Sequence, residues 1–505
     1  MRRGIREAMA LESCTVICSA YPTVLEAGNI SIGGDHPGYS MRAGIGSMAM
    51  RWGRCPSPAP VWGAYLEDHK RSRERWGSMR RLIGCLLIWL FAAVSIGRAG
   101  WLLIPMDNSQ TNHLKAYGLT YWALQEPRRY KAEWLLNYRG GSFLIEDRPD
   151  VRRKARLMGV SYEPITDQQL ARIKAMMEEE NMDAVPLEKA PKIAVYMPPD
   201  DSPFRDPWDD AVKLALKYAE IPFDQIWDKE VLRGELQKYD WLHLHHEDFT
   251  GQFGKFYGAY RNTAWYQRRV RLFEKAAHEA GFPTVPKHKG AVALMIRDYV
   301  LTGGFLFAMC SATDTLDIAL ATNGGQVDIV PPEIDGTPID PDYERKLDFS
   351  KTLMFTNFKI ITDPYIYEFS DIDNPNPDRN PLSGAEDFEL FEFSAKHDPI
   401  PTILTQNHVA KVHGFLGQTT SFNRKRLKKN VIILGDIPGS NYVKYIHVQV
   451  GKGMATFLGG HDPEDYIHLV GDPPTNLDLH KHSPGYRLIL NNILLPAAKR
   501  KPQKT

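Results

Sequence analysis

The chain has 505 residues, of which 43% are hydrophobic and 24% are charged, proportions that are ordinary for a globular protein. Its formal net charge is +1, so no overall field favours nucleic acid or an anionic membrane as a partner. Five cysteines occur without a CxxC pair or the Cys/His spacing of a zinc site, and no motif predicts a cofactor. The length suffices for two or three domains.

An uncharged run at residues 82–97 is flanked by arginines at 80, 81 and 98. It is short for a membrane span, which needs roughly 20 residues, and it suits the hydrophobic region of a signal peptide. We therefore predict a signal peptide over 79–99, export to the periplasm or the extracellular space, and no stable membrane span after cleavage. Residues 1–78 lack sustained periodicity and are predicted to be a non-native or disordered extension ahead of Met79. A tethering helix that continues to Pro105 is the alternative.

From Trp101 onward, strand-like and helix-like segments alternate, which predicts an α/β fold. The first part, an N-terminal α/β region, covers residues 100–190 and ends in a linker at 181–191. Its expected elements are strands at 101–106, 132–138, 142–145 and 160–164, and helices at 108–125, 150–157 and 167–180.

A second alternation begins at Lys192 and predicts an α/β domain over 191–500. Residues 325–430 lose the alternation and are predicted to form a mostly β insertion, while the basic tail 501–505 is expected to fray. The expected strands are 193–197, 223–227, 240–246, 305–309, 430–434, 445–450 and 454–458, and the expected helices are 209–220, 229–238, 267–280, 289–301, 311–321 and 485–495.

Cys310 is the only cysteine beyond the first hundred residues. It follows the apolar strand 305–309 and precedes a helix that begins near Ser311. Such a turn projects a side chain from the edge of a sheet, beside helix N–H groups that favour a thiolate. A buried, inert cysteine is the alternative interpretation.

Three predicted strands end in residues that can carry chemistry, and open parallel sheets bind ligands at such ends. Cys310 is one of these ends, and the segment 459–465 (GGHDPED) is another. The third is the segment 243–248 (HLHHED), in which period-two alternation places His243 and His245 on one face of the strand.

Two chemistries fit these ends. In the first, Cys310 is a nucleophile, His461 is its base and Glu464 orients the base. Asp462 is the alternative orienting acid, and the N–H of Ser311 contributes to an oxyanion hole. The remaining predicted pocket residues are His245, His246, Glu247 and Asp248.

In the second, His245, His246, Asp248 and His461 bind a divalent metal, although no HExxH-type spacing supports it. Structural hydrogen bonding of these histidines is a further alternative. Elsewhere, Asp210 is predicted to cap the helix that follows it, and His480 and His482 are expected to be solvated.

Two segments, Gly303–Thr315 and Gly451–Asp465, resemble those of the trehalose-utilisation (ThuA-like) branch of the class I glutamine amidotransferase-like superfamily. The resemblance covers roughly 192–499, with 325–430 poorly matched. It implies a flavodoxin-like doubly wound parallel sheet, in which Cys310 and His461 match the nucleophile and base. Glu464 lies three residues past His461 instead of two, and Ser-Ala follows Cys310 where a Tyr/Leu-Gly pair is usual.

The whole mature chain also resembles exported bacterial proteins labelled asparagine synthetase B. That label requires an N-terminal nucleophilic cysteine and an SGGxDS loop for ATP, and this sequence has neither. The sequence therefore predicts an exported cysteine-dependent hydrolase or amidohydrolase for a small amide or carbohydrate derivative. A metal-dependent hydrolase is one alternative. Another is a non-catalytic carbohydrate-binding protein, marked by an aromatic cleft of Trp241, Phe249, Phe253, Tyr257 and Tyr260.

Overall fold

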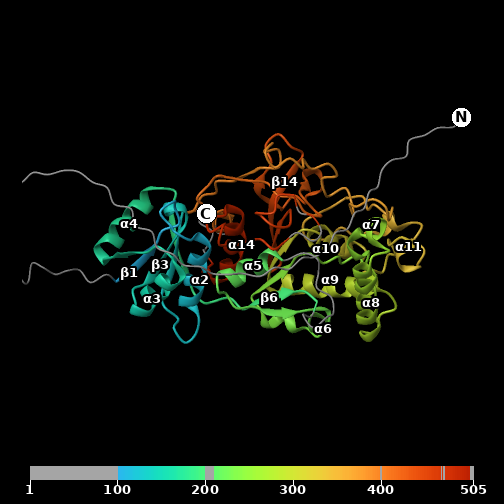
Figure 1. Cartoon of the computed structure of the whole chain (residues 1–505), viewed down its shortest axis with the longest axis horizontal. Coiled ribbons are helices and arrows are strands. Elements are labelled where there is room, and N and C mark those ends of the chain that lie inside the picture. Colours follow the sequence, from blue (N-terminus) through green and yellow to red (C-terminus); the bar gives the residue numbers. More distant parts are fainter. Residues whose placement is uncertain (1–99, 199–209, 399–400, 468, 470–472, 501–505) are drawn as a thin grey trace, which may run out of the picture. The chain divides into compact units, whose positions relative to one another are not determined.

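The computed structural model describes residues 100–198, 210–398, 401–467, 469 and 473–500. The predicted extension (1–78), signal peptide (79–99) and basic tail (501–505) lie outside these residues and stay predictions. Within the described part, no helix is both long and apolar enough to cross a bilayer. The fold is mixed α/β, with strands in two sheets (Figure 1).

The first sheet has five antiparallel strands in the order β4-β1-β3-β2-β5. Apolar side chains alternate along these strands, so helices α2 and α3 pack on one face and α4 packs on the other. The predicted linker at 181–191 is wrong, because it contains the edge strand β5. The elements are β1 (Trp101–Ile104), α2 (His113–Leu124), β2 (Ala132–Leu136), β3 (Ser142–Glu146), α3 (Pro149–Met158), β4 (Glu163–Ile165), α4 (Asp167–Glu179) and β5 (Asp183–Leu187).

The second sheet has ten strands, and its main path runs β11-β10-β13-β14-β15-β9-β8-β6-β7, with β12 paired to β14. The pairs among β7, β6, β8, β9 and β15 are parallel, and the remaining pairs are antiparallel. The strands are β6 (Ile193–Tyr196), β7 (Asp224–Ile226), β8 (Trp241–Leu244), β9 (Phe305–Met309), β10 (Phe388–Leu390), β11 (Lys411–Val412), β12 (Phe422–Asn423), β13 (Ile432–Asp436), β14 (Tyr442–Val450) and β15 (Gly453–Leu458).

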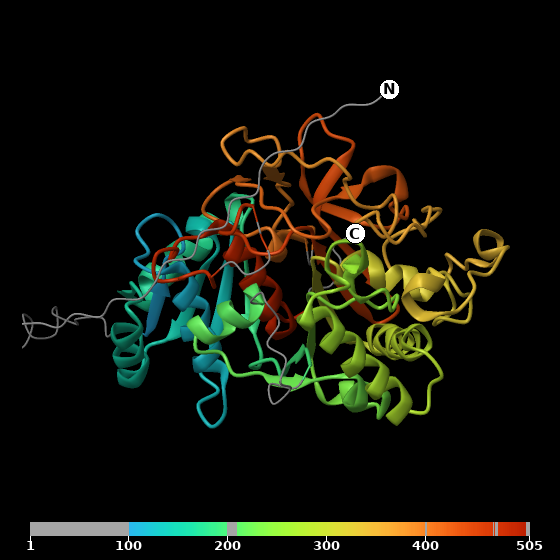
Figure 2. The same ribbon diagram turned by 45° about the vertical axis from the view of Figure 1, so that its right-hand side comes forward.

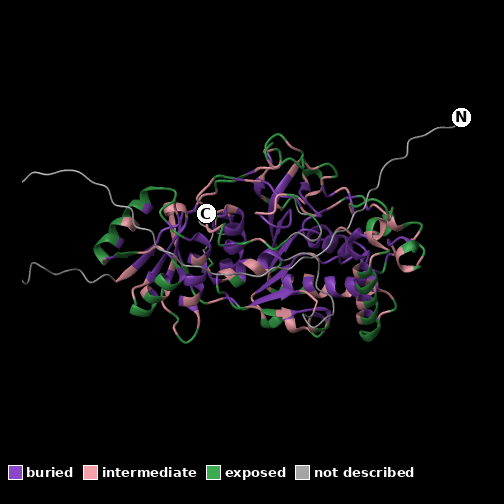
Figure 3. Ribbon diagram, in the orientation of Figure 1, coloured by how far each residue is buried: buried purple, intermediate pink, exposed green. Residues whose placement is uncertain are grey.

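Helices cover both faces of this sheet, so its central strands are buried (Figures 2 and 3). One face packs against α5 (Ala211–Tyr218) and α14 (Pro484–Leu494). The other face packs against a larger group of helices, and α7 lies at its margin. These are α6 (Asp228–Leu232), α7 (Tyr257–Tyr260), α8 (Ala264–Glu279), α9 (Val285–Thr302) and α10 (Ala312–Ala321).

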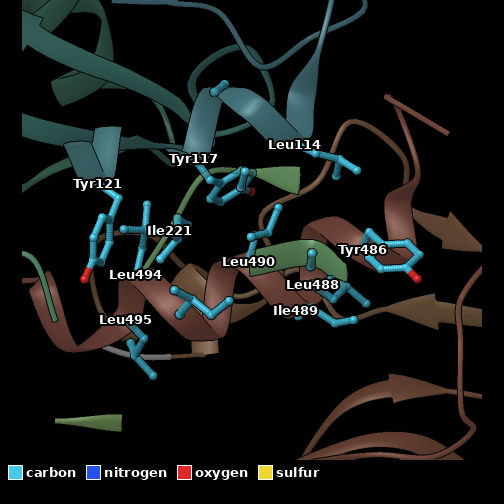
Figure 4. Packing of buried hydrophobic residues seen from close by; sticks show 14 of the residues in the cluster. Leu114, Tyr117, Tyr121, Ile221, Tyr486, Leu488, Ile489, Leu490, Leu494 and Leu495 are labelled. Carbon is cyan, nitrogen blue, oxygen red and sulfur yellow. The ribbon is translucent and has the colours of Figure 1, made fainter. Parts of the chain in front are cut away.

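Helix α14 joins the cores of the two sheets, because α2 packs along it (Figure 4). Leu114, Tyr117 and Tyr121 of α2 lie on the side that faces α14. The Tyr117 hydroxyl donates a hydrogen bond to the Asn491 side chain within this apolar contact. The two sheets therefore share one continuous hydrophobic core.

The prediction of a mostly β insertion at 325–430 is wrong. Most of this region is irregular chain that contains the short strands β10, β11 and β12. It also holds the one-turn helices α11 (Pro332–Asp335), α12 (Tyr343–Lys346) and α13 (Pro401–Leu404). Side chains hold the irregular chain in position. The Asp317 carboxylate, for example, accepts the backbone N–H groups of Leu353, Met354 and Phe355.

The buried imidazole of His447 makes stability depend on pH. It lies on β14 with its Nδ1 2.9 Å from the Thr456 hydroxyl, and burial lowers its pKa from 6.5 to about 4. The unfolded chain therefore binds one more proton than the folded chain between these values. The contribution of His447 to the free energy of unfolding is fully present above pH 6.5 and is lost as the pH drops. At pH 5 the loss from this residue is about 2 kcal/mol.

We expect His447→Gln to remove that contribution, so that urea unfolding at pH 7 and pH 5 shows a smaller difference than in the wild type. The variant His278→Gln, at an exposed position of α8, is the control. Equal losses in wild type and His447→Gln would contradict the neutral burial of His447.

Candidate functional site

The parallel register brings the three predicted strand ends together. Leu244 of β8 pairs with Ala308 of β9, which pairs with Phe457 of β15. Beyond these pairs, the Cys310 N–H donates to the Gly460 carbonyl at 3.1 Å, and the Ala312 N–H donates to the His245 carbonyl at 3.0 Å. The loops after β8 and β15 are therefore hydrogen-bonded to the turn at Cys310.

Three imidazoles converge at this edge, and we name His245, His246 and His461 the histidine cluster. One ring nitrogen from each lies within 4.8 Å of those from the other two, and Nε2 of His246 is 3.2 Å from Nε2 of His461. The rings of His245 and His246 are stacked, with their centroids 3.9 Å apart. His245 and His461 are buried and His246 is half-buried.

A second group of potential ligands, Asp210, His243 and His245, shares one member with the histidine cluster. The Asp210 carboxylate lies 3.2 Å from Nε2 of His243 and 3.3 Å from Nδ1 of His245. The predicted cap is confirmed, since Asp210 also accepts the Lys213 N–H at the start of α5. The contact of Asp210 with two histidines was not predicted from the sequence. The position of Asp210 as a helix cap was the only feature of the sequence that singled out this residue.

The electrostatics of Asp210 follow from this setting. Burial opposes ionisation of its carboxyl, but the electrostatic attraction of His243 and His245 holds its pKa well below its ordinary value. A buried carboxylate is thus kept ionised beside the imidazoles.

Cys310 occupies the predicted turn between β9 and α10. Its φ of +52° lies in the left-handed region, which favours glycine, as in a nucleophile elbow. The sulfur accepts the Gln418 N–H at 3.3 Å. The thiol is buried, and burial raises its pKa to about 11, against the N–H groups of Gln418 and Ser311, which favour the thiolate. At neutral pH the group is therefore a thiol.

Two buried carboxyls contact the segment 418–420, whose Gln418 N–H binds this sulfur. Thr419 donates its hydroxyl to Asp314 at 2.9 Å, and Asp373 accepts the Thr420 N–H at 2.8 Å. Burial raises the pKa of Asp314 to about 7, and burial together with the charge of Asp314 raises that of Asp373. This acid-rich setting also disfavours a thiolate.

The two predicted orienting acids have defined partners. Asp462 accepts the Tyr486 hydroxyl at 2.7 Å, and burial raises its pKa. The Glu464 carboxylate lies 2.8 Å from Nδ1 of His480 and accepts the Tyr466 hydroxyl at 3.1 Å. His480, which was predicted to be solvated, is partly exposed and pairs with Glu464.

Glu247 and Asp248 organise the loop after β8. The Glu247 carboxylate lies 3.2 Å from the buried Lys289 ammonium. Asp248 accepts the backbone N–H groups of Thr250 and Gly254. Among the described residues, Asp248 belongs to neither group of potential metal ligands, so Asp210 replaces it as the carboxylate beside the histidines.

The aromatic cleft predicted for a carbohydrate-binding protein is wrong. Trp241, Phe249 and Phe253 are buried core residues, and Trp241 packs on the face of the sheet opposite to the other two. Only Tyr257 and Tyr260 of that set are partly exposed.

Comparison with known proteins identifies no family. No protein-family model matches the chain, and none of the curated proteins compared with it matches. It is similar to the Cytoplasmic Protein STM1381 from Salmonella typhimurium LT2, at 11% identity and a TM-score of 0.31, over 61% of this chain and 100% of that chain. A second similar structure is the Cytoplasmic Protein STM3548 from Salmonella typhimurium, at 11% identity and a TM-score of 0.28, with the same coverage. Likenesses this weak carry no argument about function.

Lys289 pairs with two buried carboxylates beside the site. Its ammonium lies 3.0 Å from Asp228 and 3.2 Å from Glu247, and its side chain is fully buried. Removing one partner of a buried ion pair leaves uncompensated charge, so we expect Lys289→Met to lower the free energy of unfolding by about 3–5 kcal/mol. Urea denaturation measures this change.

The matched control is Lys275→Met, since Lys275 forms an exposed pair with Glu279 on α8. Its effect should stay below about 1 kcal/mol. A loss of that small size in Lys289→Met would contradict the role of Lys289 in holding the Glu247 loop.

Proposed function

We propose that the protein is a hydrolase that works with a divalent transition metal bound by His245, His246 and His461. The observation that carries the proposal is the convergence of three imidazoles at the carboxyl ends of parallel strands. Imidazole nitrogen is a preferred ligand of zinc and similar metals. Three protein ligands leave one position of a tetrahedral site open, as catalytic rather than structural zinc sites do.

The nitrogen spacing supports this proposal. Zinc–nitrogen bonds of about 2.0–2.1 Å at a tetrahedral angle separate two ligand nitrogens by about 3.3 Å. Nε2 of His246 and Nε2 of His461 are 3.2 Å apart. The separation of these two nitrogens therefore matches one edge of a tetrahedral site.

Hydrolysis is the chemistry that this ligand set suits. A metal with histidine ligands supplies Lewis acidity and brings the pKa of bound water near neutrality. His246 is half-buried and so is the member of the cluster that contacts solvent, whereas His245 and His461 are buried. The substrate class follows the sequence prediction, a small amide or carbohydrate derivative, and the predicted export remains part of the proposal.

We also infer a flavodoxin-like arrangement of the parallel strands. Numbered in chain order, β7-β6-β8-β9-β15 reads 2-1-3-4-5, the order of flavodoxin-like sheets. In such sheets, ligands bind where the strand order reverses, between the first and third strands. These strands are β6 and β8, and β8 leads directly into His245 and His246.

To test the proposal, the purified protein would be stripped with a chelator and titrated with Zn²⁺ against a chromophoric competitor. We expect one tight site per chain. His246→Ala and His461→Ala should each weaken binding by more than about 100-fold, because loss of a ligand exceeds the effect of losing an outer-shell partner. Hydrolysis of a panel of activated esters and amides should fall on stripping and return with metal.

His447→Gln is the control, because His447 is buried but lies outside both groups of potential ligands. It should bind Zn²⁺ like the wild type. A wild-type protein that binds no metal with micromolar or tighter affinity would sink the proposal.

A cysteine-dependent hydrolase is the second candidate, and the left-handed conformation of Cys310 favours it. Non-glycine residues adopt this strained backbone where the surrounding structure enforces it, often at reactive sites. With a pKa near 11, the thiol would need His461 to remove its proton.

Cys310→Ala separates the two candidates, since it leaves the histidine cluster intact. For the metal-dependent hydrolase we expect activity within about threefold of the wild type and unchanged Zn²⁺ affinity. We also expect iodoacetamide at pH 7.5 to modify Cys310 slowly in the folded protein, measured at peptide level by mass spectrometry. Loss of activity with unchanged metal affinity, together with rapid alkylation, would assign the reaction to the cysteine.

A further inference from the structure

We propose that Asp210 is the positioning residue of the metal centre: it holds His245 through Nδ1 and thereby presents Nε2 of His245 to the metal. This inference rests on the proposed function and assigns a role to a side chain distant in sequence from the histidines.

The geometry places the Asp210 carboxylate between two imidazoles. One oxygen lies 3.3 Å from Nδ1 of His245, and the other lies 3.2 Å from Nε2 of His243. Period-two alternation places His243 and His245 on the face of β8 that α5 covers, and Asp210 stands at the N-terminus of α5. The contact is thus fixed by one strand and one helix.

The carboxylate is anchored before any metal binds. Asp210 accepts the Lys213 N–H at 2.9 Å as the cap of α5, and it is only 7% exposed. On its other side, His243 is fully buried and its Nδ1 lies 3.2 Å from the Phe307 carbonyl of β9. A carbonyl oxygen only accepts, so Nδ1 of His243 donates to Phe307, and Nε2 of His243 faces the Asp210 carboxylate.

The cap contact with Lys213 and the approach of the carboxylate to Nδ1 of His245 assign Asp210 an outer-shell role, and a second metal at Asp210, His243 and His245 is the alternative that the test separates. In a carboxylate–histidine–metal arrangement, the carboxylate accepts from one ring nitrogen, fixes the orientation of the ring and increases the basicity of the other nitrogen. Loss of such a partner typically weakens metal binding by about 10- to 100-fold.

The test is Asp210→Asn, which keeps a good helix cap and a similar shape but removes the carboxylate charge. Zn²⁺ titration of the stripped full-length protein should show one site per chain, bound about 10- to 100-fold more weakly than in the wild type. The Co²⁺-loaded variant should keep a tetrahedral absorption spectrum, because the three imidazole ligands remain. A purely structural role would change stability and leave the Zn²⁺ affinity unmoved.

Asp317→Asn is the matched control. Asp317 is also buried, but its carboxylate accepts the backbone N–H groups of Leu353, Met354 and Phe355. We expect this variant to lose stability and to keep the wild-type affinity for Zn²⁺.

The outcomes separate this inference from the proposed function. A wild-type protein without a metal site overturns both. A wild-type site with Asp210→Asn affinity within about threefold of it overturns only the positioning role. Two metal ions per wild-type chain, reduced to one in Asp210→Asn, would make Asp210 a ligand of a second metal and likewise overturn the positioning role.

Discussion

The parallel pairing of β8, β9 and β15 is the constraint on which the site depends. Hydrogen bonds between these strands fix their relative register, so the three chain segments leave the sheet at the same level. His245 and His246 follow β8, Cys310 follows β9 and His461 follows β15. Residues more than 200 positions apart in sequence thereby become neighbours. A shift of one residue in any of these pairings would turn His245 or its partners to the opposite face of the sheet.

Burial of polar groups on this framework has a consistent pattern. On the face covered by α5, His243 and His245 replace apolar residues and receive Asp210 as a partner. On the face covered by α9, Lys289 receives Asp228 and Glu247. An unpaired polar group at these buried positions would be less stable than an apolar side chain. Each buried polar group therefore has a partner of complementary charge or hydrogen-bonding capacity. Such a concentration of paired polar side chains at the strand ends is typical of a functional site rather than of packing.

Local patterns in the sequence were sufficient to predict many of the helices and strands. The apolar run at 305–309 and the helix after it predicted β9 and α10, and the alternation from Trp241 predicted which histidines share a face. The region 325–430 was predicted poorly, because side-chain contacts such as those of Asp317, instead of hydrogen bonds between strands, hold its chain in position. The pairing of Glu464 with His480, and of Asp210 with two histidines, depended on how loops and helices pack in three dimensions. No spacing along the chain encodes those contacts.

The strain at Cys310 has a structural account that does not need a reactive thiol. The left-handed backbone there lets the chain turn sharply from β9 into α10. At that turn, the N–H of Cys310 binds the Gly460 carbonyl, next to His461, and the N–H of Ala312 binds the His245 carbonyl. One strained residue thus ties the two histidine-bearing loops to the same turn. The left-handed conformation costs of order 1–3 kcal/mol, and it persists because the surrounding hydrogen bonds hold the turn in place. The side chain meanwhile points toward Gln418, where burial keeps the sulfur protonated. The backbone of Cys310, more than its thiol, is what the histidine cluster requires.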